Sequence, residues 1–383
     1  MIKQLKKNRL FVGELVLLLV LIPLFTSVLT IDYFSDAEAI KSKGTSLTKY
    51  GSTTGIVCGD KLCSKQNSFQ SNTIKIKNAE LKQGVFESAM IFTQTPPEID
   101  PEKGYFVTEI ADGLYWLIDG SYQTMFLTTG KGVIVIDAPK EMGEKYLDAI
   151  SEVTSEPVTH FIYSHFHKDH VGAAHQFRDD VVYIAHKDAA EHLRLKNDPN
   201  RPIPTITFED TYTLSVGNQI LELSYIGPFH SKGDIVIFAP KQKVAMVVDL
   251  FHPGAGPFKA FGLTKDMNAY LKAHDILLEQ YDFDVLVSGH EKILATKDYL
   301  KTNKEFTLDV MQNAIKAREM IDFAQIAQEY DHLGRSAMFN ALFDEQAQIC
   351  SELTLQKWQD KLNELKPFME DHCMAMIFYV GID

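Results

Sequence analysis

Three histidines and one aspartate fall within six consecutive residues, His165 to His170, directly after an apolar run that is typical of a buried strand. In an extended backbone, side chains two residues apart lie on the same side, so His165 and His167 can bind one metal ion. Where a helix follows the turn, Asp169 and His170 point in another direction and suit a second metal ion nearby. The cluster therefore predicts a metal site.

The ligand types narrow the choice of metal. Imidazole nitrogens and carboxylate oxygens without a thiolate favour zinc and also tolerate iron or manganese. We therefore expect two Zn2+ ions, with iron or manganese as the alternatives. The four cysteines are all distant from the cluster in the sequence, and metal-activated water needs no nucleophilic side chain, which disfavours covalent catalysis.

Each metal ion needs further ligands from elsewhere in the chain. His230 lies between two strand-like runs, Asp249 ends the apolar run 244–248, and His290 ends the run 285–289. In α/β folds, the loops at the ends of strands converge on one edge of the sheet. We therefore expect these three residues to complete the site.

The ordered pattern His-x-His-x-Asp-His, then His, Asp and Gly-His, resembles the metallo-β-lactamase superfamily of dinuclear metallohydrolases over residues 105–300. The resemblance implies an α/β fold, a four-layer αβ/βα sandwich. It puts His165, His167 and His230 on the first metal, Asp169, His170 and His290 on the second, and Asp249 on both.

Two further positions belong to this resemblance. Asp137 ends the strand-like run 133–136 and is expected to orient the site without touching the metal. Many relatives have glycine before the bridging aspartate, whereas this chain has Val248. We expect that difference to shift the carboxylate of Asp249 slightly.

Two metal ions that share a water molecule lower its pKa toward about 7, which favours hydrolysis. Asp169, beside the attacking water, is the expected catalytic residue that handles the proton. The oxygen-reducing relatives with two irons have glutamate where this chain has His167, which favours a hydrolase of a lactam, lactone or thioester. The alternatives are a glyoxalase-II-like thioesterase and a non-catalytic metal-binding or sensory protein at the cell surface.

The remaining histidines lack ligand-like spacing, and we expect them to be structural or on the surface. They are His160, His175, His186, His192, His274, His332 and His372. His252, three residues after Asp249, is either structural, or it contacts a metal ligand or the substrate.

Three loops are candidates for substrate binding, residues 120–124, 197–204 and 252–259, because each has a turn residue near the expected site. Within or near them Arg201, Lys232 and Lys259 either pair with a substrate carboxylate or lie in solvent. The chain has 51 acidic and 38 basic residues and a net charge of −13. Because a phosphate backbone repels such a protein, we expect a small-molecule substrate and no nucleic acid.

The chain begins with a basic segment, followed by an apolar stretch over residues 10–30 that only Glu14 interrupts. This pattern predicts a signal peptide or an N-terminal membrane anchor within residues 1–39, with the enzyme outside the cytoplasm, either secreted or anchored. Residues 40–100 are polar and predict a spacer. In it, Cys58 and Cys63 are expected to form a disulfide, with a zinc knuckle as the competing idea.

Apolar residues recur at helical spacing after residue 300. They predict a catalytic domain over 101–300 and a helical C-terminal extension over 301–383. The extension packs on the core or on another subunit, and a substrate-binding role stays open. Cys350 and Cys373 in it either pair or stay free.

Overall fold

The computed structural model describes residues 85–177 and 180–382, all within one unit that spans residues 71–383. The predicted signal or anchor segment, and Cys58 with Cys63, lie outside the described residues. Within the described ranges, every helix is either too short or too polar to cross a membrane.

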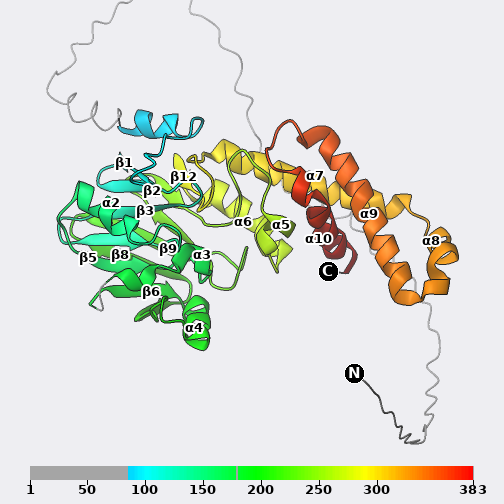
Figure 1. Ribbon diagram of the computed structural model, residues 1–383, viewed down its shortest axis with the longest axis horizontal. Coiled ribbons are helices and arrows are strands. Elements are labelled where there is room, and N and C mark those ends of the chain that lie inside the picture. The colour runs from blue at the N-terminus through cyan, green and yellow to red at the C-terminus, as the bar shows by residue number, and fades with distance from the viewer. Residues whose placement is uncertain (1–84, 178–179, 383) are drawn as a thin grey trace, which may run out of the picture. The chain divides into compact units, whose positions relative to one another are not determined.

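Residues 106–287 are built around two β-sheets (Figure 1). The seven-stranded sheet is antiparallel from β1 to β4 and parallel from β4 to β7. Its strands are β1 (Phe106–Ala111), β2 (Leu114–Ile118), β3 (Gln123–Thr128), β4 (Val133–Ile136), β5 (Val158–Ile162), β6 (Val182–His186) and β7 (Ile206–Phe208).

The five-stranded sheet has the order β12-β11-β10-β9-β8 and is antiparallel except between β11 and β12. Its strands are β8 (Thr211–Val216), β9 (Gln219–Tyr225), β10 (Ile235–Ala239), β11 (Val244–Met246) and β12 (Val285–Val287).

The four layers follow from side chains that alternate between the two faces of each strand. In β4, Ile134 and Ile136 pack into the core between the two sheets, whereas Val133 and Val135 pack under the outer helices. In β10, Ile237 enters the same central core and Val236 packs on the opposite side. Because successive side chains point to opposite faces, each sheet is buried on both sides. The predicted four-layer αβ/βα sandwich is confirmed.

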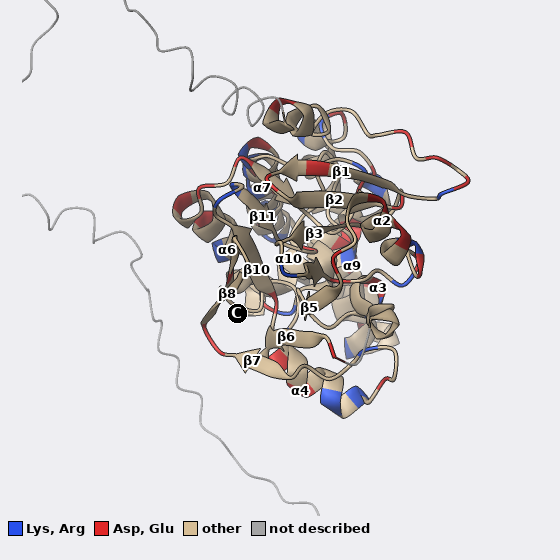
Figure 2. Ribbon diagram, turned by 90° about the vertical axis from the view of Figure 1, so that its left-hand side faces the viewer, with Lys and Arg blue, Asp and Glu red and all other residues tan. Residues whose placement is uncertain are grey.

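Helices cover both outer faces. On the seven-stranded sheet lie α2 (Lys145–Val153), α3 (Lys168–Val171), the short η1 (Ala174–Gln176) and α4 (Lys187–Lys196). On the other sheet lie α5 (Lys259–Leu263), α6 (Met267–Gln280) and the C-terminal helices. Figure 2 shows acidic and basic residues interspersed over the viewed side of the ribbon.

The described part of the expected spacer is packed. Residues 85–91 are helical, Ala89 is buried, and Phe86 and Phe92 contact the core between the sheets. The backbone of Phe92 also accepts a hydrogen bond from Leu294 N at 2.9 Å. Apolar residues three apart give this segment one apolar face. The composition suggested a loosely folded spacer over residues 40–100. In the described part of that range, from residue 85 onward, the chain is instead packed against the core.

The helical extension is present, and it begins at Lys297 rather than Lys301. It contains α7 (Lys297–Met320), α8 (Phe323–Tyr330), η2 (Asp331–Leu333), α9 (Arg335–Trp358), η3 (Lys366–Phe368) and α10 (Met369–Ile382). Its apolar residues, among them Phe306, Trp358 and Met369, share one core with the five-stranded sheet. The extension therefore packs on the sandwich, as one of the two expected alternatives stated.

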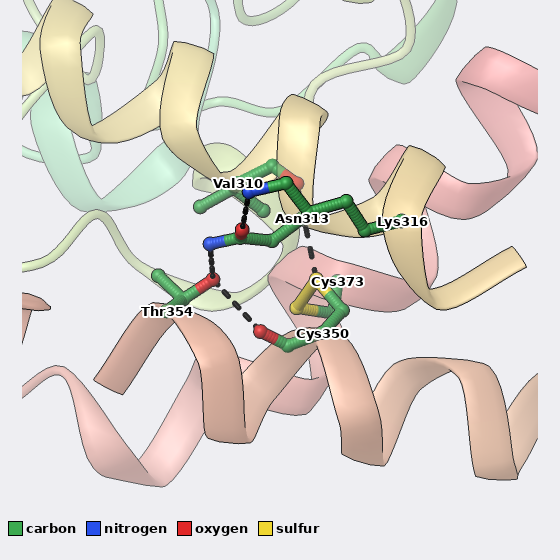
Figure 3. The surroundings of a disulfide bond; sticks show 6 residues. All are labelled: Val310, Asn313, Lys316, Cys350, Thr354 and Cys373. Atoms are coloured by element: carbon green, nitrogen blue, oxygen red, sulfur yellow. Dashed lines mark hydrogen bonds between the residues drawn. A yellow bond between two sulfur atoms is a disulfide. The ribbon is translucent and has the colours of Figure 1, made fainter. Parts of the chain in front are cut away.

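A disulfide between Cys350 and Cys373 joins α9 to α10, with an S–S distance of 2.04 Å (Figure 3). Both residues are fully buried. Beside them Thr354 donates a hydrogen bond to the Cys350 carbonyl at 2.8 Å and accepts one from Asn313 at 3.1 Å. The sequence left open whether Cys350 and Cys373 pair or stay free, and in this structure they form a disulfide.

Candidate metal centre and its cavity

All seven predicted ligand residues meet at one edge of the two sheets. His165 and His167 follow β5, Asp169 and His170 lie in α3, and His230 lies between β9 and β10, while Asp249 and His290 follow β11 and β12. They form two adjoining groups, His165 with His167, His230 and Asp249, and Asp169 with His170 and His290. His167 is in the extended conformation, which is why His165 and His167 share a group.

Asp249 lies between the groups. Its Oδ2 is 3.4 Å from His165 Nε2 and 3.2 Å from His230 Nε2. Its Oδ1 is 3.1 Å from His170 Nε2 and 3.2 Å from His290 Nε2. One carboxylate thus offers an oxygen to each group, which is the arrangement expected of a bridging ligand.

The side chains fit a metal ion. His165 Nε2 is buried without a hydrogen-bond partner, and His167 Nδ1 lies only 2.9 Å from His230 Nε2. Tetrahedral zinc with bonds of about 2.1 Å places its ligand atoms roughly 3.4 Å apart. The spacings around Asp249 are close to that value. Because a buried nitrogen without a partner calls for an ion or a proton, the donor set is suited to metal.

A hydrogen-bonded chain orients His165. Asp137 accepts hydrogen bonds from Ser164 N at 2.8 Å and Ser164 Oγ at 2.6 Å, and Ser164 Oγ lies 2.9 Å from His165 Nδ1. Because the Ser164 hydroxyl donates its hydrogen to Asp137, its oxygen can accept a hydrogen bond from Nδ1–H of His165. The Nε2 of His165 is then free to bind a metal. Burial raises the pKa of Asp137 to about 7. Asp137 therefore lies where the sequence placed it, behind a ligand.

Asp234 fixes the backbone at His230, and the sequence reasoning missed it. It accepts hydrogen bonds from His230 N at 2.8 Å and Ser231 N at 2.6 Å, and it is buried. Burial raises its pKa to about 6. An aspartate four residues after a candidate ligand, in a loop with Gly233, is the signal that could have found it.

Gln123 fixes the loop that carries His290. It is buried at the start of β3, and its Nε2 donates to Ser288 Oγ at 3.2 Å and to the carbonyl of Ile293 at 3.0 Å. Of the predicted substrate loop 120–124, Tyr122 lines the cavity, whereas Gln123 and Thr124 are buried strand residues. The prediction was therefore too broad, because β3 begins earlier than the sequence suggested.

Val248 is accommodated by the glycine opposite it. A Cβ on Gly289 would lie 2.6 Å from Val248 Cγ1 and 3.2 Å from His170 Cε1. Gly289 also has a φ of 87°, a conformation that glycine adopts readily. The side chain of Val248 therefore occupies the space left by Gly289, and the carboxylate of Asp249 still reaches both groups.

Asp249 and the histidines of the cluster shift one another's pKa values. Burial opposes ionisation of Asp249, but His170 and His230 outweigh it and hold the pKa of Asp249 well below its usual range. Burial lowers the pKa of His165 well below 6.5 and that of His167 to about 4. Burial opposes protonation of His170 and His230, but Asp249 outweighs it, so the pKa of His170 rises to about 9 and that of His230 rises above 6.5. A metal ion binds an ionised carboxylate and neutral imidazoles, so its binding would release the protons of His170 and His230.

The expected carboxylate-binding cations lie elsewhere. Arg201 is buried and donates to the Phe166 carbonyl at 2.6 Å and to Asp198 at 3.1 Å, so it supports the backbone beside His167. Lys259 pairs with Asp371 at 3.2 Å, and Lys232 is outside the cavity lining. The loop 197–204 likewise contributes no residue to that lining.

A cavity of about 370 Å³ opens on the metal-ligand cluster. Five of its lining residues belong to the cluster, and the others are Tyr122, His252, Phe258, Gly262 and Leu263. We call Tyr122, Phe258 and Leu263 the apolar wall. Among the described residues that line this cavity, neither lysine nor arginine occurs.

His252 belongs to the cavity. Its ring stacks on His290 with centroids 5.2 Å apart, and its Nδ1 lies 3.1 Å from Glu291 Oε1. A purely structural role was one of the two expectations, and the contact with a predicted ligand favours the other.

The C-terminal extension holds the loop that carries Phe258 and Leu263. Gly256 N donates to the Asn363 carbonyl at 2.9 Å, and Asn363 N donates to the Gly254 carbonyl at 3.0 Å. Phe261 N donates to Nδ1 of buried His372 at 3.1 Å. Burial lowers the pKa of His372 to about 3, so its imidazole stays a neutral acceptor. His372 is thus a satisfied core residue, as expected, but it supports a cavity loop.

The four-layer fold and the clustered histidines and aspartates define a metal-binding protein of the αβ/βα class, and the comparisons agree. Residues 117–290 match the family model "Metallo-beta-lactamase superfamily". A metallo-beta-lactamase type 2 of Elizabethkingia meningoseptica is 25% identical over 213 residues, which are 52% of this chain and 82% of that protein. The chain therefore contains a region, residues 117–290, that matches the metallo-beta-lactamase superfamily.

Two other similarities add detail. The 2,4-dinitroanisole O-demethylase subunit alpha of Nocardioides sp. is 27% identical over 212 residues, 52% of this chain, and the match covers 63% of that relative, less than two thirds of its length. A metallo-beta-lactamase structure from Pontibacter korlensis is 22% identical, with a TM-score of 0.46, and covers 52% of this chain and 99% of that one.

Proposed function

We propose that this protein is a zinc-dependent hydrolase that cleaves a carbonyl substrate, a lactam, lactone or thioester, with two metal ions. The observation that carries the proposal is Asp249, whose two oxygens lie within 3.4 Å of nitrogens from both groups of histidines. The first ion would be held by His165, His167, His230 and Asp249, and the second by Asp169, His170, His290 and the same Asp249.

Bound in these positions, two zinc ions would lower the pKa of a shared water molecule and polarise a carbonyl oxygen. The chain supplies the rest. Asp169 lines the cavity with 42% of its side chain exposed, so a carboxylate oxygen can take the proton that the water loses. Ser164 and Asp234 keep His165 and His230 in place, and the apolar wall limits the water around the substrate.

Metal analysis and a substrate panel test the proposal. We expect close to two zinc equivalents per chain, and zinc-loaded protein that hydrolyses at least one of a lactam, a lactone and a thioester. A chelator should stop turnover, and added zinc should restore it. 2,4-Dinitroanisole belongs in the panel because of the Nocardioides relative's name. One tightly bound iron, or zinc without turnover of any substrate, would contradict the proposal and favour the metal-binding or sensory alternative.

A glyoxalase-II-like thioesterase is the second candidate, and the contacts of Asn363 and His372 with the cavity loop favour it. Through these contacts the C-terminal extension supports a loop that lines the cavity, and a larger thiol group would extend toward that loop. Thioester turnover at least tenfold above that of lactams and lactones would support this candidate.

We also propose that the protein acts outside the cytoplasm. The basic and apolar N-terminal segment and the disulfide between Cys350 and Cys373 support this, because such bonds persist in oxidising compartments. Cell fractionation with thiol labelling tests it. Full-length chain in the cytosol with Cys350 and Cys373 reduced would contradict it.

A further inference from the structure

The apolar wall lies beside the polar metal-ligand cluster, and its side chains are large and accessible. Phe258 and Leu263 are 48% and 46% exposed, and both line the cavity beside the metal-ligand residues. The Tyr122 ring lies 4.8 Å from the ring of His290, which places it against the cluster. Exposed apolar side chains in a concave site mark the part that contacts an apolar ligand.

The wall lacks a cation that could balance a charge on the substrate. Lys259 is next to Phe258 in the sequence, but its ammonium group pairs with Asp371. His252 pairs with Glu291 at 3.1 Å. An anionic group that entered this side of the cavity would lose water and gain no partner, which is costly.

We propose that the part of the substrate that faces the wall is neutral and presents a small apolar group to Tyr122, Phe258 and Leu263. This inference rests on the proposed hydrolase function and adds the class of substrate. Bound metal ions would attract an anionic group at the reacting end of the substrate. A carboxylate at the opposite end would instead contact the wall. Phe258 and Leu263 are therefore specificity-determining residues.

A matched pair of substrates tests the inference. The pentanoyl and succinyl thioesters of one thiol differ by an ethyl group in place of a carboxylate. We expect kcat/KM to be at least about 100-fold higher for the pentanoyl thioester. Equal values, or a preference for the succinyl thioester, would overturn the inference.

Binding gives a readout that does not depend on turnover. The non-hydrolysable ketone analogues of both thioesters, with methylene in place of sulfur, can be titrated into zinc-loaded protein by calorimetry. We expect the neutral ketone to bind at least tenfold more tightly. If neither thioester is cleaved while the neutral ketone binds preferentially, thioester hydrolysis fails and the inference stands. Equal binding of the two ketones contradicts the inference itself.

A cation placed in the wall should weaken the preference for the neutral substrate. Leu263→Lys keeps an unbranched Cβ at a φ of 61° and adds an ammonium group to the cavity. We expect the pentanoyl to succinyl ratio to fall at least tenfold through the KM of the succinyl thioester. Phe258→Lys is the second variant if the first melts at a lower temperature, and Leu195→Lys, on α4 and 77% exposed, is the control. An unchanged ratio in both folded wall variants would contradict the inference.

Discussion

The metal-ligand cluster and the apolar wall line the same cavity but are supported in different ways. The cluster sits on strand ends, and buried aspartates behind it hold its histidines. The wall depends on a loop, residues 252–263, that receives its support from Asn363 and His372 in the C-terminal extension. Changes in the first region should therefore alter turnover and metal affinity, whereas changes in the second should alter substrate binding.

Asp169→Asn gives the largest expected effect. It removes the proton acceptor, so kcat should fall by about 10²–10⁴-fold. The melting temperature should stay the same, because the side chain is partly exposed. Zinc should bind more weakly at the second position, because Asp169 is one of its proposed ligands, so turnover is compared at saturating zinc. Steady-state kinetics and metal analysis check this, with Asp298→Asn, 87% exposed on α7, as the matched control. A fully active variant would refute the role given to Asp169.

Ser164→Ala tests the support behind the cluster. Without the hydroxyl, His165 Nδ1 loses its partner and the ring is no longer oriented. We expect zinc affinity to fall by about 10–100-fold, measured by competition with a chromophoric chelator. Ser151→Ala, which removes an exposed hydroxyl on α2, is the control. Unchanged affinity would show that the ligand needs no such support.

His372→Leu moves the test to the wall. The variant loses the acceptor of Phe261 N, a buried hydrogen bond worth about 1 kcal/mol. We expect KM for the neutral substrate to rise about 3–10-fold, with kcat and zinc content nearly unchanged. His372→Asn offers an amide oxygen near the position of Nδ1 and should restore most of the KM. If kcat or zinc content fell while KM stayed the same, the prediction that the wall controls substrate binding rather than turnover would be wrong.

Cys350→Ala with Cys373→Ala should have the smallest effect on activity. The crosslink closes a loop with a sequence separation of 23 residues, so its loss should lower the free energy of unfolding by about 3 kcal/mol. KM should rise less than in His372→Leu, because α10 keeps its apolar contacts with α7 and α9. Chemical denaturation and kinetics at 25 °C measure both. A larger KM change than in His372→Leu would mean that the disulfide positions the wall directly.

The same difference explains what the sequence could predict. The seven cluster residues follow apolar runs or lie in one short motif, so local spacing located them. Asp234 was missed because a hydrogen bond to a loop backbone leaves only a weak trace in the sequence. Tyr122 and Phe258 of the wall lie in the predicted substrate loops 120–124 and 252–259, whereas Leu263 was missed. The support of the wall was also missed, because Phe261 and His372 are 111 residues apart and their contact depends on how the extension packs. For Arg201 and Lys259 the sequence left a substrate carboxylate and solvent open as partners, whereas their partners in the fold are Asp198 and Asp371.

Residues 260–263 form a left-handed turn in which Ala260, Phe261 and Leu263 have φ values of 49°, 55° and 61°. Each such residue costs on the order of 1 kcal/mol, so the turn persists only while other contacts hold it. The helix that holds it, α10, contains none of the predicted ligands. Sequence drift in α10 can therefore retune which substrates enter while the catalytic residues stay constant, and this gives the protein a route to new specificities.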